Sequence, residues 1–217
     1  LVTHHGSIQK ELENPDQIDE HYYEILDKIF SQVQNGDPIC TFSLDSSNVL
    51  FSTCNAKDKN QEMINWHLNQ THDDELNKVI DYYHFAMNSE SGKMLNIGFP
   101  KAIRQSFQTN MSLLKSKLNG LSVGIFSAEV GARQWMHADK NGSYLIWKIG
   151  KKKNDELLYI QNSELVSYFS IHRSGKKGKV NWQFGDSVAA ESICKDIINA
   201  QNYTSKKFSS AEQVYLY

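Results

Sequence analysis

Hydrophobic residues recur every three or four positions near the start of the chain, which is the spacing of an amphipathic helix. This pattern covers residues 15–33, and Asn35-Gly36 follows it as a typical helix end. Residues 60–89 and 101–118 carry the same period and predict two or three further helices. The apolar spacing over residues 188–200 predicts a last helix.

Short runs rich in β-branched and aromatic residues predict strands. The runs PICTFSL and VLFSTCNAK are joined by four polar residues, Asp45 to Asn48, and predict a β-hairpin. In the second half, the runs LSVGIF, SYLIWKIG, ELLYI, YFSIHR and VNWQF predict further strands. This order predicts an α+β or mixed α/β fold, with a central mixed sheet flanked by helices.

Length and composition favour one domain over residues 1–217, since 40% of the residues are hydrophobic and nothing resembles an interdomain linker. We divide it into a helix and hairpin at 15–60, a helical middle at 60–120 and a strand-rich half at 121–217. No apolar run reaches the roughly 18 residues of a membrane helix. The first residues lack the order of a secretory signal, so a cytoplasmic location is expected.

Charge divides the chain into two contrasting parts, although the net charge is only -2. Residues 1–92 carry 5 Lys or Arg and 16 Asp or Glu, whereas residues 93–180 carry 15 and 5. Such a distribution permits a positive face that binds a phosphate backbone. A lysine-rich surface exposed to solvent explains it equally well.

Candidate chemistry lies at the ends of the predicted hairpin. Asp37 precedes its first strand, and Asn55 and Lys57 end the second strand on a shared face. Asp37 joins that face if the loop has five residues, in the register that pairs Ser43 with Val49. A four-residue loop would turn Asp37 away. The five-residue register also gathers the apolar residues on the other face, so burial favours it too.

An acid, an amide and a lysine in this arrangement suit phosphodiester hydrolysis. Asp37 and the amide oxygen of Asn55 would hold Mg²⁺, and Lys57 would orient the attacking water. Asn55 and Lys57 follow Asp37 by 18 and 20 positions. This spacing resembles the active-site signature of the PD-(D/E)xK nucleases, the class that includes type II restriction endonucleases, in a variant with Asn replacing the second acid. The stretches 4–30 and 171–184 are similar to the same group.

The resemblance implies a single restriction-endonuclease-like domain that cuts double-stranded DNA at a short specific site with Mg²⁺. Asp37, Asn55 and Lys57 would be catalytic. A glutamate of the first helix often completes such a metal site, and Glu24 is the candidate here, with Glu20 as the alternative. Both lie away from the apolar stripe of that helix, so a solvated position suits them equally.

DNA contacts are expected mainly in the second half, where a basic loop containing glycine lies between two strands. Lysines there would approach phosphates, and neighbouring amides would read base edges. A second candidate is the start of the helix after Pro100. The predicted DNA-binding residues are Lys101, Arg104, Arg173, Lys176, Lys177, Lys179, Asn181 and Gln183.

Expected partners are double-stranded DNA and, genetically, a cognate DNA methyltransferase in a bacterial cytoplasm. The protein would be a monomer or homodimer that does not contact membranes. Two alternatives remain open at this point. One is a nuclease toxin, or a modification-dependent nuclease, of the same fold. The other is a DNA-binding module whose catalytic site has decayed, which Asn55 in place of an acid would favour.

Overall fold

The chain forms six α-helices and ten strands over the residues that the computed structural model describes, which are 18–31, 39–55, 61–71, 74–88, 92–150, 154–174, 177–201 and 211–216. The helices are α1 (Ile18–Phe30), α2 (Gln61–Thr71), α3 (Asp74–Val79), α4 (Lys101–Leu113), α5 (Gly124–Trp135) and α6 (Ser187–Gln201), with a short 3-10 helix, η2 (Ser46–Asn48). The strands are β1 (Ile39–Leu44), β2 (Leu50–Asn55), β3 (Ile80–Asn88), β4 (Lys93–Pro100), β5 (Lys117–Val123), β6 (Ser143–Lys148), β7 (Asn154–Gln161), β8 (Glu164–Ser174), β9 (Lys177–Gly185) and β10 (Gln213–Leu216).

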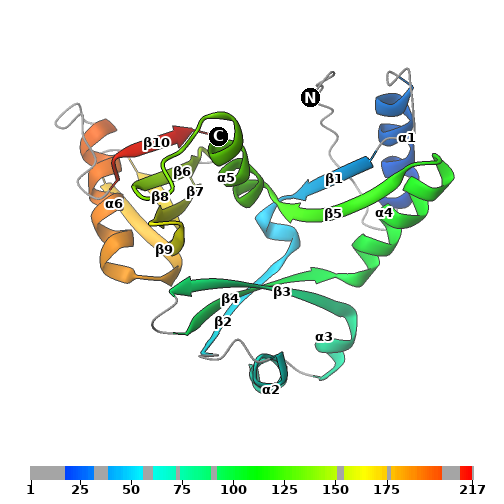
Figure 1. Cartoon of the computed structure of the whole chain (residues 1–217), viewed down its shortest axis with the longest axis horizontal. Helices are drawn as coiled ribbons and strands as arrows, with labels where there is room; N and C mark the ends of the chain where they lie inside the picture. The colour runs from blue at the N-terminus through cyan, green and yellow to red at the C-terminus, as the bar shows by residue number, and fades with distance from the viewer. Residues whose placement is uncertain are drawn as a thin grey trace.

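These strands form three sheets rather than one (Figure 1). The largest has the order β10-β6-β7-β8-β9, in which β6 to β9 are antiparallel and β10 runs parallel to β6. An antiparallel sheet has the order β2-β4-β3, and β1 pairs in parallel with β5. The mixed α+β class predicted from the sequence is confirmed. The single central sheet is wrong.

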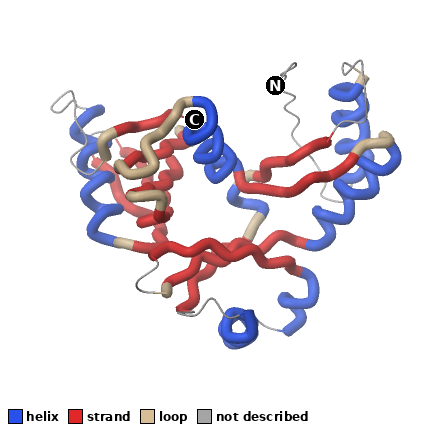
Figure 2. Tube along the Cα trace, viewed as in Figure 1, coloured by secondary structure: helices blue, strands red, loops and turns tan. Residues whose placement is uncertain are grey.

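The main hydrophobic core joins all three sheets. It includes Leu44 from β1, Leu95 from β4, Ile146 from β6 and Tyr168 from β8, each less than 9% exposed. A second core fills the opposite face of the five-stranded sheet under α6 (Figure 2). Since both faces of this sheet are buried, its central strands are almost continuously apolar, as the run SYLIWKIG shows.

The predicted hairpin of β1 and β2 does not form. β1 pairs with β5, in the register Ser43 to Ser122, and β2 pairs with β4. The polar residues between the strands form η2 instead of a hairpin turn. Asp45 caps this helix, because its Oδ1 accepts a hydrogen bond of 3.1 Å from the backbone N–H of Ser47. The chain therefore leaves β1 and enters a different sheet.

Other predicted elements are confirmed or shifted. The strands around residues 143–150, 156–160, 168–173 and 180–184 are present, as are helices at both ends of the chain. The helix predicted over residues 60–89 is wrong in its last third, where Ile80–Asn88 is β3. The run LSVGIF is divided, because β5 ends at Val123 and α5 begins at Gly124. Short apolar runs have this ambiguity between helix and strand.

No helix in the described part of the chain has the length and apolar character needed to span a membrane.

Candidate binding groove and polar cluster

A groove of about 720 Å³ lies between α1 and α4. On α4 its lining residues recur at three- and four-residue intervals, so one face of this helix forms most of the wall. The groove is lined by Tyr23, Glu24, Ala102, Gln105, Ser106, Thr109, Asn110 and Leu113. Its size is within the range of sites that bind a ligand or a peptide side chain.

The groove combines exposed apolar surface with hydrogen-bonding groups. Leu113 is 64% exposed and Tyr23 is 39% exposed, and both line the groove. The amide and hydroxyl side chains of Gln105, Ser106 and Thr109 of α4 line the same groove. Such a mixture suits a polypeptide, because a peptide offers both apolar side chains and backbone hydrogen-bonding groups.

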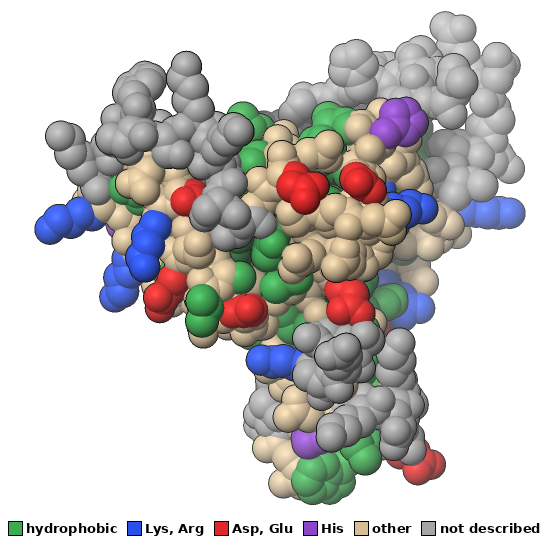
Figure 3. All heavy atoms as spheres, turned by 60° about the vertical axis from the view of Figure 1, so that its left-hand side comes forward, with side chains coloured by type: hydrophobic (Ala, Val, Ile, Leu, Met, Phe, Trp, Pro, Cys, Tyr) green, Lys and Arg blue, Asp and Glu red, His purple; other side chains and the backbone are tan. Residues whose placement is uncertain are grey.

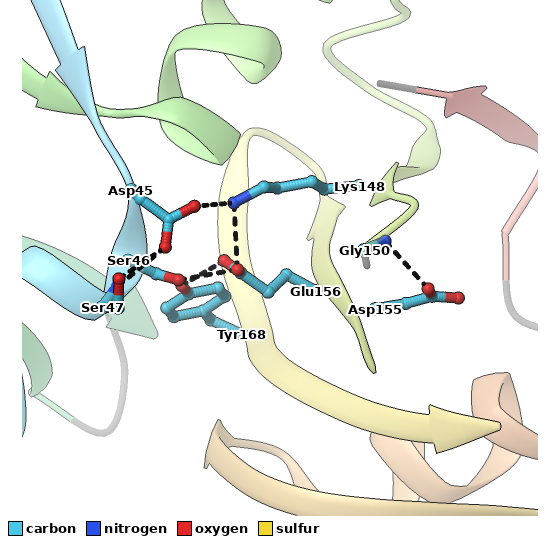
Figure 4. Close-up of polar contacts among 8 residues, drawn as sticks. All are labelled: Asp45, Ser46, Ser47, Lys148, Gly150, Asp155, Glu156 and Tyr168. Carbon is cyan, nitrogen blue, oxygen red and sulfur yellow. Dashed lines mark hydrogen bonds and ion pairs between the residues drawn. The ribbon is translucent and has the colours of Figure 1, made fainter. Parts of the chain in front are cut away.

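A polar cluster joins the segment between β1 and β2 to the five-stranded sheet (Figure 4). Lys148 of β6 donates hydrogen bonds to Asp45 Oδ2 at 2.9 Å and to Glu156 Oε1 at 3.0 Å. Ser46 donates to the same Glu156 oxygen at 2.6 Å, and the Tyr168 hydroxyl donates to Oε2 at 3.1 Å. Every oxygen of Glu156 therefore has a partner, and three distant segments of the chain are tied together.

Burial and charge shift the protonation equilibria of this cluster. Burial pushes the pKa of Asp45 upward, but hydrogen bonds from Lys148 and Ser47 outweigh it, so this pKa is lowered. Burial lowers the pKa of Lys148, but its bonds and attraction to Asp45 and Glu156 are stronger together, so the pKa is raised. For Tyr168, burial and the adjacent Glu156 carboxylate both raise the pKa, far above the ordinary value. The cluster is thus a charged ion pair with a neutral phenol.

A second buried acid organises the turn after β6. Asp155 is fully buried and accepts hydrogen bonds from Trp147 Nε1 at 2.8 Å, from the Gly150 backbone at 3.0 Å and from Arg173 at 2.9 Å. The Arg173 Nε also lies 2.6 Å from Asp155 Oδ2. This set of bonds has a structural role, because each donor comes from the same sheet or its connecting turn.

The residues predicted to be catalytic are only partly described. Asp37 and Lys57 lie outside the described residues, so their juxtaposition stays a prediction. Asn55 is exposed at the end of β2, opposite Lys93 of β4. Glu24 is exposed on α1 and lines the groove, whereas the side chain of Glu20 is outside the described set.

No group of three or more His, Cys, Asp or Glu residues that could hold a metal ion occurs in the described ranges. The expected Mg²⁺ site is therefore untested where it depends on Asp37.

Several predicted DNA-binding residues make structural contacts instead. Lys101 Nζ donates to the backbone oxygen of Lys78 at 2.7 Å, and Arg104 forms an ion pair of 2.7 Å with Asp81. Arg173 is held by the buried Asp155. The residues of β9, namely Lys177, Lys179, Asn181 and Gln183, are exposed, and Lys176 lies outside the described residues.

Two ion pairs join the two charged parts of the sequence in the described structure. Arg104 and Lys148 belong to the basic part, and their partners Asp81 and Asp45 belong to the acidic part. On the face drawn in Figure 3, basic and acidic side chains are interspersed. The contrast along the chain therefore does not produce a uniform positive surface on this face.

The sequence analysis missed the polar cluster, although the sequence contains a signal for it. Lys148 interrupts the apolar run SYLIWKIG and Glu156 begins the run ELLYI, both of which were predicted to be strands. Charged residues at such positions are paired when they are buried. Their partners, Asp45 and Ser46, come from a loop about 100 positions earlier, so the pairing requires the tertiary fold.

No protein-family model matches the sequence, and no curated protein sequence matches it either. Among solved structures, a chain of the PilM-PilN type IV pilus biogenesis complex is similar, with a TM-score of 0.52 and 11% identity over 91% of this chain. The match covers 57% of that chain, so this sequence spans less than two thirds of its length. At this identity the likeness shows a common fold.

Two other solved structures have TM-scores below 0.5. A Bacteroides thetaiotaomicron protein described as having an actin-like ATPase fold and unknown function has a TM-score of 0.37 and 9% identity, over 89% of this chain and 66% of the other. The cytoplasmic domain of EpsL, an inner membrane component of the Vibrio cholerae type II secretion system, has a TM-score of 0.46 and 9% identity, over 90% and 68%.

These findings overturn the resemblance to type II restriction endonucleases. The chain shares its fold with a component of a pilus complex, and the hairpin on which the nuclease signature depended is not formed. The site-specific deoxyribonuclease activity, double-stranded DNA as the partner and the cognate methyltransferase are therefore wrong. The physical cause is that the residues that favoured a hairpin in the sequence form strands of two different sheets.

Proposed function

We propose that this chain is a protein-binding component of a multi-protein assembly and that it holds a segment of its partner in the groove between α1 and α4. The observation that carries this proposal is the groove itself, with its exposed Leu113 and Tyr23 beside a row of polar side chains on α4. The fold shared with a chain of the PilM-PilN complex supports a role in protein assembly. A bacterial intracellular setting is part of the proposal.

The groove favours a peptide segment over a rigid globular surface. Its wall is one helix face about three turns long, which matches a short peptide rather than a broad interface. Leu113 would anchor an apolar side chain of the partner, and Gln105 or Thr109 would bond its backbone. Among the described residues that line the groove, Glu24 is the only charged side chain, so it favours a partner segment with a basic residue.

The proposal can be tested by selecting binding peptides from a random 12-residue display library on the intact chain. Individual peptides are then measured by calorimetry against two variants. Thr109→Arg places a long charged side chain in the groove. Gln108→Arg is its matched control, because Gln108 is equally exposed on the adjacent position of α4 but does not line the groove.

Selected peptides should bind Thr109→Arg at least tenfold more weakly than the unmodified chain, and Gln108→Arg with unchanged affinity. Adding Leu113→Ser to Thr109→Arg should weaken peptide binding further, because the apolar anchor is then lost. If the peptides bind Thr109→Arg and the unmodified chain alike, the partner does not occupy this groove. Circular dichroism checks that both variants remain folded.

A further inference from the structure

The outer edge of the five-stranded sheet is an unprotected strand. β10 pairs with β6 on one side, and no described strand pairs with its other side. Natural edge strands are commonly protected by lysines, prolines, bulges or a covering segment. β10 has the sequence QVYL with a regular register, so within the described part of the chain its short length is its only such device. Its outward backbone groups can therefore pair with another strand.

An apolar pocket lies beside this edge, on the face of the sheet that α5 covers. Its volume is about 330 Å³, and it is lined by successive turns of α5 together with Ile146, Tyr215 and Leu216. None of the described side chains that line it carries a charge. Tyr215 contributes one wall and packs on the main core, while the neighbouring Val214 packs on the core under α6. Successive side chains of β10 therefore point to opposite faces of the sheet.

The rim of the pocket exposes large apolar side chains. Trp135 is 70% exposed and Met136 is 62% exposed. Both line the pocket, so their apolar surface is continuous with it. Contiguous apolar patches of several hundred Å² mark interaction sites on soluble proteins.

We propose that this surface is a second docking site, separate from the α1–α4 groove, which takes an extended protein segment as a sixth strand beside β10. The segment would carry uncharged apolar side chains at alternate positions, because only one of its faces meets the pocket. Its backbone would bond the open edge of β10, and its apolar side chains would lie against Trp135 and Tyr215.

Two observations favour a polypeptide strand over other occupants. The open edge supplies a row of backbone donors and acceptors, which a lipid or a small apolar molecule would leave unpaired. The uncharged described lining matches apolar side chains and disfavours a charged segment in the pocket.

The experiment uses a labelled peptide with the sequence Thr-Val-Thr-Val-Thr-Val-Lys-Lys, whose valines share one face when it is extended. One control peptide has the same composition with the three valines adjacent, and another is N-methylated along one edge. Binding to the intact chain is followed by fluorescence anisotropy. Hydrogen exchange of the backbone amides at residues 213–216 reports whether β10 gains a paired neighbour.

The alternating peptide should bind and slow exchange at residues 213–216, whereas both control peptides should bind at least tenfold more weakly. Trp135→Glu and Met136→Glu should each reduce its affinity at least tenfold, because both residues line the pocket and are exposed. Val188→Glu is the matched control and should leave affinity unchanged, because Val188 is 76% exposed on α6, away from the pocket. All three positions are exposed, so the fold should persist.

Four results would overturn this proposal. They are absence of binding, equal binding by Trp135→Glu and the unmodified chain, binding without slower exchange in β10, and a dimer in sedimentation experiments that Trp135→Glu abolishes. The last result would assign the surface to a second copy of the chain. None of these variants touches the α1–α4 groove, so the outcome is independent of the function proposed for that groove.

Discussion

Lys148 shows how the same residue has different meanings in the sequence and in the fold. In the sequence it belongs to a basic region that suggested contacts with phosphate. In the fold its side chain is only 19% exposed and bonds two carboxylates, one of them on Glu156 of the neighbouring strand. Because removing one member of such a pair leaves the other charge buried, the cost exceeds that of a surface ion pair.

Replacing Lys148 with Met should therefore lower the free energy of unfolding by about 2–3 kcal/mol, since Glu156 loses its cation. Urea denaturation measures this change. Lys78→Met is the matched control, because Lys78 and Glu75 form a pair whose side chains are 67% and 80% exposed. It should cost less than about 1 kcal/mol. Equal losses in the two variants would show that the polar cluster does not hold the sheets together.

Tyr168 predicts a dependence of stability on alkaline pH. In the folded chain, burial and Glu156 raise its pKa far above the ordinary value of 10.0, so the phenol stays neutral. The unfolded chain releases this proton above pH 10 and is thereby favoured. The contribution of Tyr168 to the free energy of unfolding is therefore fully present below pH 10. It is lost as the pH rises toward the folded pKa, by up to about 1.4 kcal/mol per pH unit.

Tyr168→Phe removes this ionisation, so its free energy of unfolding should fall less between pH 9 and pH 11 than that of the unmodified chain. Other tyrosines with raised pKa values, such as Tyr144, contribute equally to both proteins and cancel in the comparison. Parallel pH profiles of the two proteins would contradict the assignment of a neutral Tyr168 beside Glu156.

At the scale of elements, β4 has little room for added volume at Gly98, because it lies between β2 and β3. A Cβ atom at Gly98 would lie 2.7 Å from Ile80 Cγ2 and 2.8 Å from Tyr82 Cε1, both on β3. Gly98→Ala should therefore lower the free energy of unfolding by about 1–3 kcal/mol through overpacking. Gly120→Ala on β5 is the control, because no atom lies within 4 Å of its added Cβ. Similar midpoints of thermal unfolding for the two variants would contradict this packing.

The elements also show how far the sequence could predict the fold. Periodicity located α1, α4 and α6, and the strands β6 to β9 followed from apolar runs separated by polar turns. Strand pairing was the point of failure. A hairpin needs only local residues, whereas β1 pairs with β5 more than 70 positions away. The aromatic residues of β3 also fitted a helical spacing, and only pairing with β4 decides between the two.

Prediction of the candidate sites was weaker still, because they depend on contacts between distant segments. Glu24 was selected as a metal ligand, but in the fold it lines a groove against α4. Arg104 and Arg173 were selected for DNA, but they pair with Asp81 and Asp155. Their carboxylate partners lie 18 or more positions away in the sequence, so a composition argument counts the charges without locating them.

The whole molecule has two separate surfaces that suit protein segments. The α1–α4 groove offers a mixed lining, and the β10 edge offers backbone groups beside an uncharged pocket. The main core joins the three sheets, so both surfaces belong to one packed structure. This arrangement suits a component that holds other polypeptides.

Hydrogen–deuterium exchange of the intact chain, with and without a peptide selected for binding, tests the central claim most directly. The peptide should slow exchange in Ile18–Phe30 and Lys101–Leu113, which form the groove, and this effect should disappear in Thr109→Arg but persist in Gln108→Arg. A duplex DNA of 20 base pairs should slow exchange in neither helix. Protection confined to other elements, or protection of these helices by DNA in place of the peptide, would contradict the account.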